Sequence, residues 1–235
     1  LFSLLIIGCS KNAPELMQIA QSNLDQNEED RAIKNLDLLI SKYPDDSLAS
    51  LAQYKLVNIY KNWKHNPEMV YNALKKTVDN YPLTLQSKQA RKELDSFQEW
   101  IINKAETLRK RKLTKESINN LLYLVKKYPN HELASKGQYI IGDIYMNDLR
   151  DFEKALEEYR IVLNDYKGSK EEALAQFMIG YIYANVLKDL DKARSEYQVF
   201  LDQFPKHELF PSVKFEIDHL GKDINEIPAL KHITS

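Results

Sequence analysis

The sequence predicts an all-α solenoid of about five helical hairpins and a closing helix, on three observations. An aromatic residue, usually followed by proline, recurs at spacings of 38, 47, 38 and 38 residues, and a period in this range indicates stacked supersecondary units. Only 6 Gly and 8 Pro in 235 residues favour long helices joined by short turns. Apolar residues around each aromatic keep helical spacing. The five pairs are Tyr43-Pro44, Tyr81-Pro82, Tyr128-Pro129, Tyr166-Lys167 and Phe204-Pro205.

A helix is predicted to end at each aromatic. Proline disfavours helix at the residue before it. Counted back from the aromatic, the positions 7 and 3 residues upstream are apolar or aromatic and share one helical face. They are Leu36, Leu74, Leu121, Tyr159 and Tyr197, and then Ile40, Val78, Val125, Leu163 and Leu201.

A second helix is predicted to begin three residues after each aromatic. Asp46, Thr84 and Ser169 stand at this position, and their side-chain oxygens can accept hydrogen bonds from the free N–H groups of a helix start. His131 and His207 occupy the same position, within Pro-x-His-Glu-Leu, so we interpret them as turn residues rather than metal ligands.

The ends of the solenoid follow from the same pattern. Residues 13–26 supply a helix that pairs with 29–43. A closing helix is expected at roughly 208–221, with Pro211 in its first turn and Gly221 at its end. The solenoid therefore covers residues 13–221, without an internal domain boundary, and the tail 222–235 is expected to be weakly structured.

The one long interval, of 47 residues, contains no Pro or Gly between Phe97 and Leu108. Its nine extra residues predict a helix lengthened by about two and a half turns, which ends in the basic cluster Arg109–Lys112. We interpret this cluster mainly as favourable charge at a helix C-terminus. Contact with acidic lipid headgroups or an acidic partner is the alternative.

The sole cysteine, Cys9, ends an apolar run and precedes polar residues. The run Leu4-Leu5-Ile6-Ile7-Gly8-Cys9 resembles the lipobox of a bacterial lipoprotein, in which the cysteine becomes lipidated. This resemblance implies a signal-peptide remnant at 1–8 and a lipidated tether at 9–12. The alternative is an apolar N-terminus with an incidental cysteine.

The repeats resemble tetratricopeptide repeats, most clearly in residues 131–205. Ile141-Gly142 before Tyr145, and Ile179-Gly180 before Tyr183, are similar to the family's Leu-Gly-x-x-Tyr. Ala155-x-x-x-Tyr159 and Ala193-x-x-x-Tyr197 are similar to its Ala-x-x-x-Phe. The resemblance implies a right-handed solenoid. The lengthened repeats behind a lipobox are similar to tetratricopeptide lipoproteins of the outer membrane, of the BamD or CpoB (YbgF) type.

The resemblance also implies that the first helix of each hairpin binds peptides on a concave face. An Asn recurs at the last of the mapped positions, and an amide can donate to and accept from any peptide backbone. Packing between repeats is an equal alternative for the aromatic positions. The mapped residues are Tyr54, Asn58 and Asn62, then Tyr139, Asp143 and Asn147, then Phe177, Tyr181 and Asn185.

Catalysis is not expected. The chain has no glycine-rich phosphate loop, no Gly-x-Ser-x-Gly and no His-Glu-x-x-His, and its carboxylates lie at surface spacing. We expect no cofactor, no metal and no small-molecule substrate. A net charge of −1 gives no indication of nucleic-acid binding.

The sequence thus predicts a protein-binding scaffold of the bacterial envelope, lipid-anchored at Cys9, facing the periplasm, with other envelope proteins as partners. Ser10 and Lys11 lack the Asp that resembles an inner-membrane retention signal, so the outer membrane is favoured. A role in β-barrel assembly is one form of this hypothesis. The alternatives are a soluble adaptor and a non-catalytic accessory of the peptidoglycan or division machinery.

Overall fold

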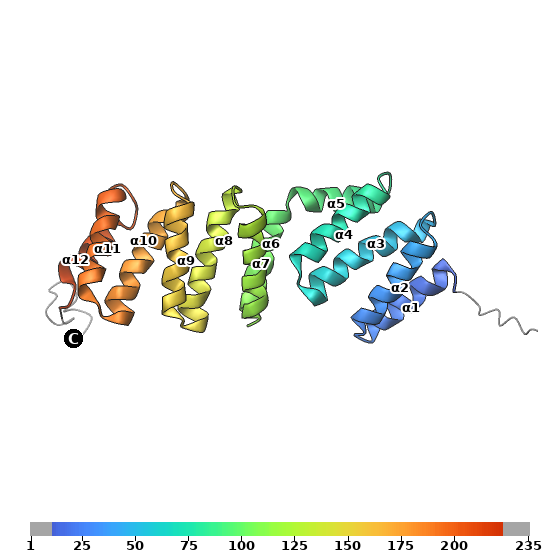
Figure 1. The fold of residues 1–235 in the computed structure, drawn as a ribbon, viewed down its shortest axis with the longest axis horizontal. Coiled ribbons are helices and arrows are strands. Elements are labelled where there is room, and N and C mark those ends of the chain that lie inside the picture. The colour runs from blue at the N-terminus through green and yellow to red at the C-terminus, as the bar shows by residue number, and fades with distance from the viewer. Residues whose placement is uncertain (1–10, 223–235) are drawn as a thin grey trace, which may run out of the picture. The chain divides into compact units, whose positions relative to one another are not determined.

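The described residues of the computed structural model, 11–222, are almost entirely helical, as Figure 1 shows. Their contacts divide the chain into two compact units, Leu1–Lys104 and Ala105–Ser235, where we expected no boundary. Cys9 and nearly all of the predicted tail lie outside the described residues. The two units, called unit 1 and unit 2 below, are therefore described separately.

Unit 1 contains two helical hairpins and the start of a third. The hairpins are α1 with α2 and α3 with α4, and each joins antiparallel neighbours through a short turn. The helices are α1 (Ala13–Asp25), α2 (Glu29–Lys42), α3 (Ser47–Ile59) with the π-helical segment η1 (Tyr60–Lys64), α4 (Pro67–Asn80), α5 (Leu85–Asp95) and the beginning of α6 (Phe97–Lys110).

Unit 2 continues from Ala105 in α6 and contains two further complete hairpins, α8 with α9 and α10 with α11, before the closing helix. Among the described residues, each unit therefore contains two complete hairpins of the about five that we predicted. The helices are α7 (Thr114–Lys127), α8 (Glu132–Ile144) with η2 (Tyr145–Leu149), α9 (Phe152–Asp165), α10 (Lys170–Tyr181) with η3 (Ile182–Leu187), α11 (Leu190–Gln203) and α12 (Phe210–His219).

The recurring aromatic forms the same turn in all five copies. Each aromatic is the C-cap of its helix, as the Tyr-Pro pattern predicts. The N–H of the residue three places later donates to the carbonyl of the aromatic at 3.0–3.1 Å. The next helix then begins at the following residue in four copies, and at Phe210 in the fifth. This turn sets the direction of each hairpin relative to the one before it within a unit.

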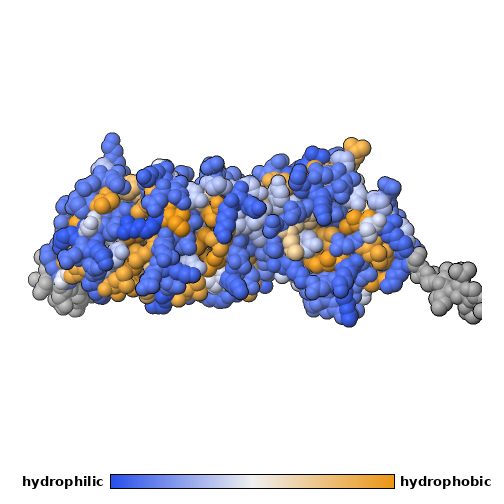
Figure 2. Space-filling model, in the orientation of Figure 1, coloured by the Kyte–Doolittle hydropathy of each residue, from blue (hydrophilic) through white to orange (hydrophobic). Residues whose placement is uncertain are grey.

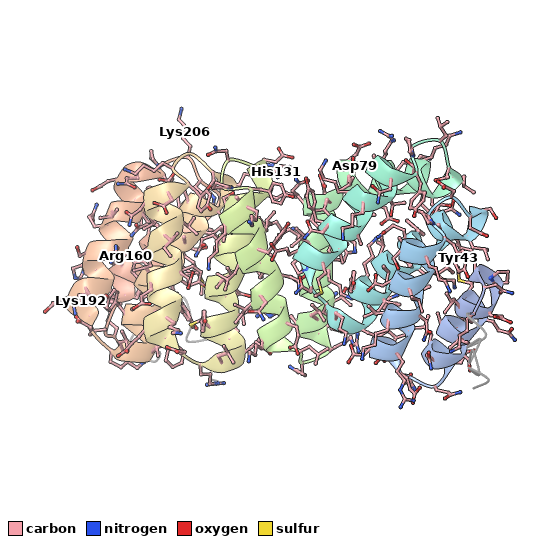
Figure 3. All side chains as sticks on the ribbon, turned by 45° about the vertical axis from the view of Figure 1, so that its right-hand side comes forward. Tyr43, Asp79, His131, Arg160, Lys192 and Lys206 are labelled. Carbon is pink, nitrogen blue, oxygen red and sulfur yellow. The ribbon has the colours of Figure 1, made fainter. Side chains whose placement is uncertain are left out.

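Most of the predicted N-caps are confirmed. Asp46 accepts from the N–H of Leu48, and Thr84 from that of Ser87. His131, which Figure 3 labels near the start of α8, accepts through Nδ1 from the N–H of Leu133 at 3.2 Å, which explains it as a turn residue. Two positions differ. Ser169 stands at the N-cap of α10, but its side chain makes no cap hydrogen bond, and His207 lies two residues before Leu209, which is the N-cap of α12.

Two predicted helix boundaries need correction. The long helix is interrupted at Ser96, so α5 and α6 are separate helices. The Ser96 hydroxyl donates to the carbonyl of Lys92 at 3.3 Å, and serine side chains compete in this way with helical continuation. The closing helix is Phe210–His219 rather than 208–221, with Pro211 in its first turn as predicted.

In the α8–α9 and α10–α11 hairpins of unit 2, a glycine on the first helix packs against a tyrosine on the second. A Cβ at Gly142 would lie 2.8 Å from Cε1 of Tyr159, and one at Gly180 would lie 2.5 Å from Cδ1 of Tyr197. Both distances are shorter than real Cβ contacts, so only glycine allows these helices to approach so closely. Both tyrosine side chains are fully buried, and their hydroxyls have no hydrogen-bond partner within the described chain.

Candidate protein-binding site

The predicted binding residues lie on the first helix of three hairpins, in the same register, and we call the surface that they form within each unit the helix-A face. In unit 1 it lies on α3 and η1, and in unit 2 on α8, η2, α10 and η3. The residues are Tyr54, Asn58 and Asn62 in unit 1, and Tyr139, Asp143, Asn147, Phe177, Tyr181 and Asn185 in unit 2.

Two aromatic members of this face, Tyr139 and Phe177, pack against the second helix of their own hairpin. The rings of Tyr139 and Tyr159 are 5.4 Å apart, and those of Phe177 and Tyr197 are 6.2 Å apart and stacked. Burial raises the pKa of Tyr139 to about 12, with smaller contributions from nearby carboxylates. These rings therefore contribute to hairpin packing, and in unit 2 they leave an accessible edge.

Tyr54 is the most buried member of the face in unit 1. It is 8% exposed, and its hydroxyl donates to the carboxylate of Glu93 on α5. Glu93 also pairs with Lys61, whose ammonium group lies 5.4 Å from the ring centroid of Trp100. Tyr54 thus joins α3 to α5, the first helix of the next hairpin, and little of its surface can reach a partner.

The asparagines are exposed. Asn147 donates through Nδ2 to Oδ1 of Asp143 at 2.6 Å, and Asn185 donates through Nδ2 to the carbonyl of Tyr181 at 3.3 Å. Each bond runs to the residue four places earlier, so it fixes the amide on the helix surface. The amide oxygen of each is left to accept from an outside donor. Asn58 and Asn62 are likewise exposed in unit 1.

The recurrent asparagines all lie in π-helical segments, which the sequence pattern did not predict. Asn62 is in η1, Asn147 in η2 and Asn185 in η3. π-Helical turns occur frequently at functional sites because they displace side chains from the regular helical register. Each segment ends at a residue with positive φ: His65 (48°), Arg150 (54°) and Lys188 (57°).

Arg109 is a site residue whose partners sequence reasoning missed. It was expected to serve mainly as charge at the end of a helix. Its guanidinium group instead forks between Asp143, at 2.5 Å, and Asp148. Asp143 therefore accepts from both Arg109 and Asn147, and this network fixes part of the helix-A face. The network joins residues 34 and 39 positions apart, which periodicity cannot reveal.

A buried glutamine also recurs, and here the sequence did contain a signal. Gln138 and Gln176 stand ten residues after their aromatics and are almost fully buried. Gln176 donates to both the carbonyl and the carboxylate of Glu196, at 3.0 and 2.8 Å, and Gln138 bonds Glu158 in the same way. Each glutamine thus ties the first helix of its hairpin to the second.

Two leucines project from the turn between α4 and α5. Leu83 is 94% and Leu85 is 74% exposed, whereas polar residues or glycine occupy the equivalent positions in the other copies. Figure 2 shows one face of the molecule, which is mainly hydrophilic with apolar areas between the hydrophilic ones.

Among residues 11–222, no cluster of three or more His, Cys, Asp or Glu side chains that could hold a metal ion occurs. None of their helices is both long enough and apolar enough to cross a membrane.

Comparison with known proteins identifies repeats in both units. The tetratricopeptide repeat family model matches residues 16–46, 137–169 and 174–207. A solved tetratricopeptide repeat protein from Parabacteroides merdae is similar at 13% identity, with 87% of this chain and 72% of that chain covered and a TM-score of 0.38. No curated protein matches the sequence. The matched repeats agree with the helical-hairpin architecture and indicate a protein-interaction scaffold.

Proposed function

We propose that this protein is a protein-binding scaffold of the bacterial cell envelope, which holds an extended segment of a partner on its helix-A face. A lipid on Cys9 would attach it to the outer membrane, facing the periplasm. Its partners would be other envelope proteins, and β-barrel assembly is one process it could serve. The matched tetratricopeptide repeats support the scaffold role.

The observation that carries the peptide-binding proposal is the pair of oriented amides in unit 2. Asn147 and Asn185 stand on successive first helices, and each has its N–H fixed within its own helix. Both side chains are exposed, so their oxygens can accept from the backbone N–H groups of an extended peptide. Such contacts do not depend on the sequence of the peptide.

The test is capture of partners by the double variant Asn147→Ala and Asn185→Ala. Crosslinking in the native host, followed by mass spectrometry, identifies the partners of the unmodified protein. We expect the double variant to lose most of this capture while its helical content stays unchanged. Asn164→Ala is the matched control, since Asn164 is an exposed asparagine on α9, the second helix of its hairpin. Unchanged capture by the double variant would exclude the helix-A face as the binding surface.

The lipid anchor needs a separate test. The sequence around Cys9 supports it, and one acylated segment attaches a protein to a membrane without a spanning helix. We expect incorporation of radiolabelled palmitate that Cys9→Ala abolishes. An unlabelled native protein would instead favour the soluble adaptor. Enrichment of β-barrel assembly proteins among the crosslinked partners would support that process, and enrichment of peptidoglycan or division proteins would favour the accessory role.

A further inference from the structure

Unit 1 contains a cavity on the opposite side of α3 from the helix-A face residues, between α2, α3 and α4. Its volume is about 200 Å³, and its lining includes Asp37, Gln53, Leu56, Tyr60 and Ala73. None of these residues belongs to the proposed peptide-binding face. The cavity therefore needs its own explanation.

Gln53 lines this cavity and lacks the partner that its counterparts have. The residue is 4% exposed, and its side chain forms none of the hydrogen bonds found among residues 11–222. It is the counterpart of Gln138 and Gln176, which bind Glu158 and Glu196. At the position of those glutamates, eight residues before the aromatic, the α3–α4 hairpin has Ala73. The cavity thus contains a polar group whose usual partner is missing.

One charged position at the rim of the cavity has the opposite sign to its counterpart beside the α10–α11 hairpin. There, Arg160 on α9, labelled in Figure 3, pairs with Glu196, which in turn accepts from Gln176. The counterpart of Arg160, six residues before the preceding aromatic, is Asp37 on α2. Asp37 has no ion pair among residues 11–222. A carboxylate therefore stands where a guanidinium stands in the other hairpin, so the missing group should be positive.

The other lining residues suit a positively charged group that is carried on an aliphatic chain. Leu56 and Ala73 are each 3% exposed and form apolar walls. The partly buried Tyr60 ring also lines the cavity, and an aromatic face attracts a cation. Partial desolvation raises the pKa of Asp37, while the positive charge of Lys76 opposes this rise. Both side chains lie at the rim and are exposed, so Lys76 is a competing cation for Asp37.

We propose that this cavity binds an alkylammonium or alkylguanidinium group. Its N–H groups donate to Oε1 of Gln53 and to the carboxylate of Asp37, and its aliphatic stem packs against Leu56 and Ala73. The chemistry is that of a lysine or arginine side chain from a partner protein, or of a free amine of the same shape. This site does not depend on the helix-A face.

The test is a titration of the full chain, observed by NMR, with n-butylammonium and n-butylguanidinium chlorides. We expect saturable shifts of the Gln53 side-chain amide and Leu56 methyl signals, and none with butyrate. Asp37→Asn should weaken the affinity about tenfold because it removes the charge-assisted hydrogen bond. Asp79→Asn is the matched control, an exposed carboxylate on α4 outside the cavity, and should change nothing. No saturable shift with either cation, or equal affinity for Asp37→Asn, would overturn the proposal.

A second variant tests the comparison between hairpins. Asp37→Arg combined with Ala73→Glu rebuilds the set formed by Arg160, Glu196 and Gln176. We expect this double variant to bind neither cation and to melt at a higher temperature, because Gln53 regains a partner. Retained cation binding would overturn the proposal.

The same titration distinguishes the two sources of the ligand. Tighter binding of a capped tripeptide with a central Lys or Arg than of the free butyl compounds would identify a partner's side chain. Tighter binding of the free compounds would identify a small amine.

Discussion

The α10–α11 hairpin of unit 2 and the α3–α4 hairpin of unit 1 fill the same space with different residues. Gly180 faces Tyr197 in the first, as Gly142 faces Tyr159 in the neighbouring hairpin. In the α3–α4 hairpin the equivalent positions carry Val57 and Leu74, both fully buried. A hairpin therefore accepts either a small residue that faces a large one or two residues of middle size. The difference indicates that the combined volume of the pair is what the hairpin requires.

The largest effect is expected when the Gly180–Tyr197 pair is changed to the Val–Leu pair of the α3–α4 hairpin. Gly180→Val should destabilise the protein by about 3 kcal/mol, because the new side chain overlaps the Tyr197 ring. Adding Tyr197→Leu creates the pair found in α3–α4 and should recover most of this loss. Urea unfolding of both single variants and the double variant, followed by circular dichroism, gives the coupling energy. Additive losses would show that the two positions do not share one volume.

A smaller effect on stability is expected from the hydroxyl groups of the two buried tyrosines. Leu74, at the equivalent position in the α3–α4 hairpin, has no such group. The hydroxyls of Tyr159 and Tyr197 are buried without a partner in the described chain. Tyr159→Phe should therefore stabilise the protein by about 1 kcal/mol, because an unpaired buried hydroxyl is removed while the ring remains. Tyr145→Phe is the control, since Tyr145 is only partly buried. A loss of stability in Tyr159→Phe would mean that the hydroxyl has a water partner that stabilises the fold.

The smallest effect concerns a feature that both units share. The turn inside each hairpin contains a non-glycine residue with positive φ, including His65 in unit 1 and Lys188 in unit 2. Replacement of either by glycine should stabilise the protein by about 0.5–1 kcal/mol, because glycine adopts this conformation without strain. Thermal unfolding should show the same gain in both units. Lys75→Gly, within α4, should cost about 1 kcal/mol instead.

Sequence reasoning predicted the features that depend on neighbouring residues. The Tyr-Pro pairs end their helices, Asp46 and Thr84 cap the next ones, and Pro211 lies in the first turn of α12, because each effect acts within a few residues. The interruption at Ser96 was missed because the apolar spacing stays in helical phase across it. Only the competition of its hydroxyl for a helical carbonyl marks the break.

The contacts of the candidate site were less predictable. Asn147 and Asn185 could be selected because they recur in register, but their placement in π-helical segments could not be read from spacing. The fork from Arg109 to Asp143 and Asp148 depends on how two hairpins pack. The glutamine that recurs as Gln53, Gln138 and Gln176 was a visible signal, but the partners of Gln138 and Gln176 become clear only when the helices are paired.

The turn at each recurrent aromatic also has a consequence for how such a chain can grow. The aromatic accepts the hydrogen bond that starts the next hairpin and ends the helix before it, so both roles belong to one residue. A segment copied from Pro129 to Tyr166 would therefore carry a complete start and a complete end. Tandem duplication of that stretch of gene would insert one more hairpin while each junction keeps its own hydrogen bonds. Repeat number can in this way change without redesign of any single turn.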